Sequence, residues 1–321
     1  MDRPKLSFFR ISRSKLSGDF IFKAVVGLFA FGIIVLAFLL FGELFIESSL
    51  SRNTFGIGFL TGSTWDPVKE VFGALPFIFG TLVSSLLALL IAIPFSLGIA
   101  IFLSELAPWK LRAPLSFIIE LLAAVPSVII GLWGIFILIP FVRDYIETPL
   151  STRLGFLPLF YVPDYGITGY SMLTGGIILA IMIIPITSSV SREVIMTVPT
   201  QQREAALALG ATGWETTRIA VIPYARSGIF GAVMLGFGRA IGETMAVTMV
   251  IGNSHKISKS LFASSDTMAS VIANDFGGAT SKLQISSLIE IGFLLLAISV
   301  IINIAARIFV WKLLKVEGAT V

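Results

Sequence analysis

The stretch EAALALGATGWETTRIAVIP, residues 204–223, lies between two long apolar runs of the chain. The residues around its start are good helix formers, Thr200 is a suitable N-cap, and Gly210 is a natural helix end. A helix of about nine residues is marginal in water without something to pack against. Leu207 and its apolar neighbours need such a surface. We therefore expect a short helix at about 200–210 that docks on another protein.

The order of residues in this stretch resembles the coupling motif of the membrane subunits of ABC importers. The resemblance rests on Glu204, Ala205 and Ala206, followed by Gly210 and then by the Ile222–Pro223 pair. In that family the loop docks into a cleft of a separate ATPase subunit, so the resemblance implies an ATPase-coupling role for these residues. An ordinary amphipathic loop helix is the alternative interpretation, and Glu-Ala-Ala alone would favour it.

The composition excludes an ordinary soluble domain. Mean hydropathy is +0.95, 56% of the residues are hydrophobic and 13% are charged. Because about 20 apolar residues cross a bilayer, the sequence predicts an all-α integral membrane protein with six transmembrane helices. The expected spans are 21–45, 75–103, 115–142, 173–190, 227–251 and 286–311. Pro94 and Pro185 predict kinks or local unwinding within the second and fourth spans.

Three parts follow from the positions of these runs. We expect a basic arm at 1–20, a first membrane anchor at 21–47, and a transmembrane domain at 75–313 that carries the coupling helix. Lysine and arginine are roughly twice as frequent on the side that holds both termini and the coupling helix as on the other side. The sequence therefore predicts that both termini and the coupling helix face the cytoplasm.

The fifth predicted span contains two charged residues. Arg239 and Glu243 are four residues apart, so a continuous helix would place both on one face. A charge at the centre of a bilayer costs about 2.5–3.5 kcal/mol and is tolerated mainly when it faces protein or a wet cavity. We interpret the pair as lining a translocation path, and a purely structural ion pair is the alternative. Gly238 and Gly242 add a GxxxG spacing that favours close helix packing.

Further acidic residues lie in or near the other spans. Glu120 falls inside the third predicted span, near its cytoplasmic end. It is a candidate for the translocation path, although it could equally reach the membrane surface. Glu105 lies at the end of the second predicted span, where we expect a solvated carboxylate.

Four segments together resemble the PstC-type permeases of bacterial phosphate ABC importers. They are IPFSLGIAIFLSELAP, IELLAAVPSVIIGLWGIF, ILAIMIIPI and GFGRAIGETMAVTMVIGN, and the likeness extends over about residues 74–317. The resemblance implies a membrane subunit of the bacterial inner membrane and roles in phosphate passage for Arg239 and Glu243. It also implies four partners: a PstA-like second permease, two copies of a PstB-like ATPase, and a PstS-like extracytoplasmic phosphate-binding protein.

Absent motifs support this division of labour. The chain has no GxxxxGK[ST] loop, no HExxH and no GxSxG, and it has no cysteine. We therefore expect a transport subunit with no enzymatic activity, metal, cofactor or nucleic-acid partner. His255, the single histidine, is expected to be exposed at the membrane interface. A sulfate or molybdate permease is the close alternative, and an embedded enzyme or a passive channel is the more distant one.

Overall fold

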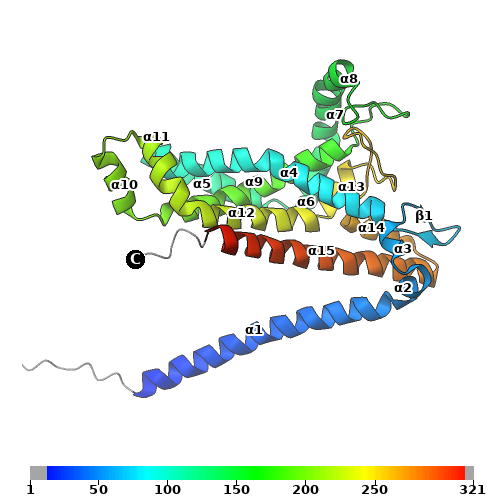
Figure 1. Ribbon diagram of the computed structural model, residues 1–321, viewed down its shortest axis with the longest axis horizontal. Helices are drawn as coiled ribbons and strands as arrows, with labels where there is room; N and C mark the ends of the chain where they lie inside the picture. Colours follow the sequence, from blue (N-terminus) through cyan, green and yellow to red (C-terminus); the bar gives the residue numbers. More distant parts are fainter. Residues whose placement is uncertain (1–12, 315–321) are drawn as a thin grey trace, which may run out of the picture.

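The computed structural model describes residues 13–314, whose helices run mostly side by side (Figure 1). Six helical segments are long and apolar enough to cross a membrane. They are Asp19–Glu47, Leu75–Leu106, Ser127–Leu154, Met172–Met196, Gly213–Gly242 and Lys282–Trp311. The prediction of an all-α membrane protein with six spans is therefore confirmed.

The elements follow one another with few long loops. The α-helices are α1 (Arg13–Glu47), α2 (Ser49–Phe55), α3 (Gly58–Thr61), α4 (Leu75–Ile101), α5 (Trp109–Ala124), α6 (Ser127–Trp133), α7 (Ile139–Val142), α8 (Thr148–Leu154), α9 (Met172–Met196), α10 (Thr200–Ala208), α11 (Gly213–Thr216), α12 (Ile222–Gly242), α13 (Met245–Val250), α14 (Met268–Asp275) and α15 (Lys282–Leu314). Four π-helical turns and one 3-10 turn extend or join them: η1 (Phe102–Leu106), η2 (Gly134–Leu138), η3 (Arg143–Glu147), η4 (Thr217–Val221) and η5 (Phe276–Gly278). Strands β1 (Trp65–Asp66) and β2 (Val71–Phe72) pair antiparallel.

The third span does not start where the sequence suggested. Val125 and Pro126 are extended, with ψ values of 127° and 138°, so the chain breaks between α5 and α6. A proline disfavours helical geometry at the residue before it, which accounts for the break at Val125. The membrane-crossing segment is Ser127–Leu154, so the predicted span 115–142 overlaps it but begins and ends too early.

The fifth span is also shifted. It runs over Gly213–Gly242, earlier than the predicted 227–251, and α13 follows as a separate short helix.

The prolines of the second and fourth spans do not break their helices, in contrast to Pro126. Pro94 lies inside α4 and Pro185 inside α9, and both helices continue through the proline.

Helix α9 forms the centre of the bundle and packs against α4 and α12. Small residues allow these close approaches. A Cβ on Gly236 of α12 would lie 2.4 Å from Thr187 Oγ1 of α9, and a Cβ on Gly228 would lie 2.4 Å from Val194. Nothing lies within 4 Å of a Cβ built on Gly238 or Gly242. The predicted packing through Gly238 and Gly242 is therefore not made within the part of the chain that the structure describes.

Helix α1 stands apart from the bundle over most of its length (Figure 1). Its membrane-crossing window has no buried residue, whereas 61% of the corresponding window of α9 is buried. Its C-terminal end is tied to α15, where Ser286 Oγ donates to Glu47 O at 2.8 Å. Of the predicted basic arm, residues 1–12 lie outside the described part, and Arg13 begins α1.

The two ends of the bundle differ. At one end α10 and α11 project beyond the long helices, and we call this the α10 end (Figure 1). At the other end the β1–β2 hairpin, α14 and the loop 252–267 form what we call the cap. The cap is closed by an apolar cluster that contains Phe59, Trp65, Phe77, Met268 and Leu288.

Candidate functional site

Arg239 lies in the last turn of α12 and is exposed on the surface of the chain. It lines a surface hollow between α9, α12 and α15 together with Ile186, Leu235 and Asn303. Among the described residues its guanidinium has no hydrogen bond or ion pair. An open guanidinium in a mostly apolar surface is available to an anion or to a neighbouring protein.

Glu243 does not share a helix face with Arg239. Helix α12 ends at Gly242, and Glu243 has an extended backbone with φ −71° and ψ 126°. Glycine favours such an end because it loses the most conformational freedom in a helix. Glu243 is half-buried and makes no ion pair within residues 13–314. The expectation of a same-face Arg239–Glu243 pair is wrong for this conformation.

Glu120 lies on α5, outside the third membrane-crossing segment. It is exposed and lines a narrow hollow between α5 and α9, together with Ser116, Ser188 and Arg192. Arg239 lines a different hollow. The structure therefore does not gather the three predicted path residues into a single cavity.

Helix α10 occupies the predicted position of the coupling helix. Its N-cap is Pro199, which offers no side-chain hydrogen bond, so the expected cap at Thr200 is wrong. Its other end matches the prediction, since Gly210 has a φ of +90°. The Ala211 and Gly210 amides donate to the Ala206 and Leu207 carbonyls at 3.2 and 2.9 Å. This Schellman arrangement satisfies the last carbonyls of the helix.

The α10 end exposes apolar side chains that the described residues do not cover. Leu207 is 51% exposed, Leu209 is 90% exposed and Trp214 is 54% exposed. Glu204 and Ala205 are exposed as well, while Ala206 is buried against the bundle. Water-exposed apolar groups next to a polar helix are typical of a surface that binds another protein.

One guanidinium fastens α10 to the bundle. Arg203 donates from Nη2 to Glu105 Oε1 at 2.8 Å and from Nε to Glu105 Oε2 at 3.3 Å. The Glu105 side chain is only 14% exposed. The expectation of a solvated Glu105 is therefore wrong. The sequence did not reveal this pair because its members are far apart in the chain. The only local indication was that Arg203 directly precedes Glu204, at the start of the predicted coupling motif.

One face of α12 has no partner among residues 13–314. Gly231, Leu235, Gly238 and Gly242 recur at three- and four-residue intervals, which places them on one side of a helix. Leu235 is 55% exposed, and a Cβ built on any of the three glycines would have nothing within 4 Å. Arg239 is adjacent to this open face.

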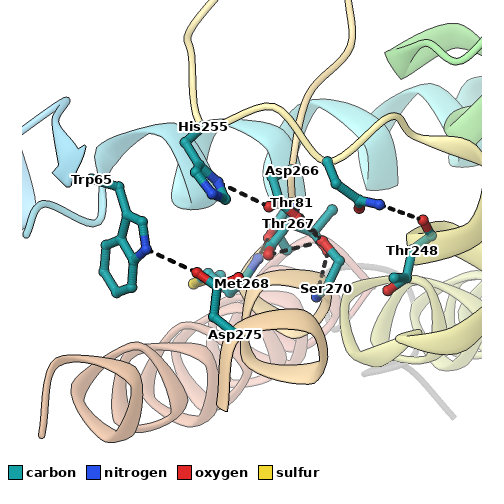
Figure 2. A network of polar contacts seen from close by, with 10 residues as sticks. Trp65, Thr81, Thr248, His255, Asp266, Thr267, Met268, Ser270 and Asp275 are labelled. Carbon is teal, nitrogen blue, oxygen red and sulfur yellow. Dashed lines mark hydrogen bonds and ion pairs between the residues drawn. The ribbon is translucent and has the colours of Figure 1, made fainter. Parts of the chain in front are cut away.

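Buried polar contacts hold the cap together (Figure 2). His255 Nδ1 lies 3.2 Å from Asp266 Oδ2, whose carboxylate also accepts from the Thr267 amide and the Ser270 hydroxyl. This contact with the Asp266 carboxylate raises the pKa of His255. Asp266 is buried and His255 packs on Phe77. The prediction of a merely exposed interface histidine is therefore wrong.

The fold is that of a helical membrane protein, and the comparisons identify its family. Residues 92–315 match the family described as binding-protein-dependent transport system inner membrane component. The chain therefore belongs to the family of inner membrane components of binding-protein-dependent transport systems.

Two curated relatives are more specific. The chain is 46% identical to "Phosphate transport system permease protein PstC" of Mesorhizobium japonicum, over 87% of this chain and 84% of the relative. It is 45% identical to the protein of the same name from Haemophilus influenzae, over 93% and 95%. The chain is thus similar to PstC-type permeases, as the sequence motifs indicated.

Solved structures share the fold. A chain of a bacterial ABC transporter involved in import of the acidic polysaccharide alginate aligns with a TM-score of 0.61, covering 93% of this chain and 99% of that one, at 15% identity. A chain of the MetNI methionine ABC transporter aligns with a TM-score of 0.53, covering 73% and 93%, at 17% identity. These likenesses concern the fold alone.

Proposed function

We propose that this chain is the membrane-spanning subunit of an ATP-driven importer of inorganic phosphate. The observation that carries the proposal is the similarity to PstC-type phosphate permeases over most of both chains. The six membrane-crossing segments and the displayed helix α10 are consistent with it. This chain forms part of the translocation path, and ATP hydrolysis belongs to a partner.

Arg239 is the residue that meets the oxyanion. Its guanidinium offers a planar set of donors that suits a tetrahedral oxyanion, and it is exposed next to the open face of α12. Glu243 lies directly beyond the end of the same helix. A carboxylate there repels the anion as the path changes shape and so promotes its release. Glu120, which lines the hollow between α5 and α9, belongs to the part of the path nearer α10.

The open face of α12 is where a PstA-like second permease packs. Its glycines let a second helix approach closely, and that contact covers Leu235 and closes the path around Arg239. A PstS-like binding protein delivers phosphate at the cap.

Helix α10 docks on a PstB-like ATPase, of which the complex holds two copies. Glu204, Ala205, Ala206 and Gly210 belong to this docking element, with Ala206 on its buried side. The exposed Leu207 and Leu209 supply its apolar contact. The α10 end is therefore cytoplasmic, as are both termini, in the bacterial inner membrane.

Labelled-phosphate uptake tests the proposal. The chain is reconstituted with its candidate partners in proteoliposomes containing ATP, with sulfate and molybdate as competitors. We expect uptake that requires ATP, is unaffected by the competitors and disappears in Arg239→Ala. Arg153→Ala removes an exposed arginine of α8 and serves as the matched control. Uptake of sulfate or molybdate in place of phosphate would overturn the substrate.

Glu243→Gln separates the role of the second charge. The variant should assemble normally and transport poorly, because it keeps the shape of the side chain and loses its negative charge. Normal transport by this variant would contradict the role of Glu243 in release.

A further inference from the structure

Arg203 uses its guanidinium to join three separate elements. Besides the two bonds to Glu105 of η1, Nη2 donates to Ile195 O at 3.0 Å and Nη1 donates to Val198 O at 2.5 Å. Ile195 belongs to the last turn of α9, and Val198 lies in the link between α9 and α10. The helix α10 is thus bonded at one point both to the C-terminal end of α9 and to the extension of α4.

The chemistry of this junction is well matched. The C-terminal end of a helix carries partial negative charge and favours a cation, and the two-pronged pairing with a carboxylate fixes the direction of the guanidinium. The side chains of Arg203 and Glu105 are 21% and 14% exposed. A surface ion pair would contribute little, but this one is largely shielded from water and makes four hydrogen bonds.

The Glu105 side of the junction leads along α4 to the cap. Helix α4 runs unbroken from Leu75 to Ile101, and η1 extends it to Leu106. Near its other end, Thr81 Oγ1 accepts from the Met268 amide of α14 at 2.9 Å (Figure 2). A single rod of helix therefore connects the Arg203 junction with the cap.

The covalent route from α10 leads elsewhere. From α10 the chain continues through α11 and the π-helical turn η4 into α12. Without the Arg203–Glu105 pair, a movement of α10 would pull on α9 and α12 through the backbone. Helix α4 would then follow through side-chain packing and one long hydrogen bond, from Ser96 Oγ to Ile184 O of α9 at 3.4 Å. Both η1 and η4 are π-helical, a geometry that is frequent at functional sites.

We propose that the Arg203–Glu105 pair is a rigid link that transmits the movement of α10 to α4 and through Thr81 to the cap. Arg203 and Glu105 are positioning residues, and they stay paired throughout the transport cycle. The inference rests on the proposed function, because it presumes that an ATPase moves α10.

The test compares phosphate uptake with ATP hydrolysis in the complete reconstituted complex. Arg203→Gln and Glu105→Gln should still assemble and hydrolyse ATP, while phosphate moved per ATP falls about tenfold, the order of a typical coupling free energy between two sites. Arg203→Lys should give an intermediate ratio of phosphate moved per ATP, because lysine keeps the positive charge but cannot make the two-pronged pairing with a carboxylate. Lys110→Gln removes an exposed cation near the same end and should behave as the unaltered protein. An unchanged ratio in both glutamine variants would overturn the link.

A bridged pair keeps the test decisive if a single variant fails to assemble. The chain has no cysteine, so Arg203→Cys with Glu105→Cys can be joined by a short bismaleimide in a complex whose partners lack reactive thiols. The double cysteine variant should move little phosphate per ATP before the bridge is formed and recover the normal ratio afterwards. A bridge that arrests transport, or leaves it uncoupled, would show that the two sites do not move as one body.

A readout at the cap does not depend on the cargo. An environment-sensitive label at Asn274→Cys, an exposed position of α14, should report an ATP-driven change in otherwise unaltered protein and in Lys110→Gln. Arg203→Gln should lose that change, and its persistence would overturn the link. If the unaltered complex gives the change and moves no phosphate, the proposed substrate fails and the link stands.

Discussion

The two ends of the molecule are held in opposite ways. The cap is closed by a buried aromatic cluster and by contacts among His255, Asp266 and Ser270, so its shape depends on many groups. At the α10 end, Arg203 bonds α10 to Glu105, and Leu209 is open to solvent. Many interlocking contacts suit a part that must keep its shape. Few contacts and an exposed apolar surface suit a part that binds a partner and passes on its movement.

The largest effect on the stability of the isolated chain should come from Asp266→Ala in the cap. The substitution leaves His255, Thr267 and Ser270 without their shared buried acceptor. We expect a loss of about 3 kcal/mol in the free energy of unfolding, within the range for a broken buried pair. Denaturant unfolding in detergent measures it. Asp164→Ala, at an exposed carboxylate, is the control and should change the value by less than about 0.5 kcal/mol.

The next effect, at the α10 end, should be local. Arg203→Gln removes the fork that bonds α10 to Glu105, so amides of α10 should exchange with deuterium about tenfold faster or more, in keeping with a lost charge-assisted contact. Amides of the cap should keep their protection. Equal loosening of both ends would mean that Arg203 also stabilises the cap, and the comparison would fail.

The third effect is a dependence of the free energy of unfolding on pH, which arises in the cap. Asp266, and more weakly Asp275, raise the pKa of His255 above its usual value of 6.5. Protonated His255 therefore stabilises the fold fully below about pH 6.5, and this contribution is lost as the pH rises through the raised value. We expect at most about 1 kcal/mol, because the ring is 33% exposed. Thermal unfolding at about pH 6 and about pH 9 measures it.

His255→Gln provides the control for this pH dependence. The variant cannot gain the proton, so the difference between the two pH values should shrink. A difference of the same size in the variant would assign the pH dependence to other groups.

The smallest effect on the isolated chain should come from Leu209→Ser. The side chain is 90% exposed, so the free energy of unfolding should change by less than about 0.5 kcal/mol. The same variant should retain less ATPase subunit during co-purification, because the apolar contact is lost on docking. Ala206→Ser changes a position that is buried against the bundle, so it should lower the stability of the chain instead.

The sequence alone determined the class of the protein. Runs of about 20 apolar residues are sufficient to define membrane helices, since a bilayer leaves the backbone few other options. Local chemistry likewise placed the end of α10, because Gly210 adopts the positive φ that glycine accepts readily. The motifs shared with phosphate permeases could also be recognised from the sequence, because each is a continuous stretch of the chain.

Tertiary structure decided the rest. The sequence could not place the break after Gly242 that removes Glu243 from the helix of Arg239, because a regular helix through that segment satisfied its local pattern equally well. Nor could it pair Arg203 with Glu105, which are 98 residues apart and meet only after α4, α9 and α10 have packed. Periodicity reports which residues share a face of one element. Contacts between distant elements depend on where each helix starts and ends, and here a single break changes which charges can meet.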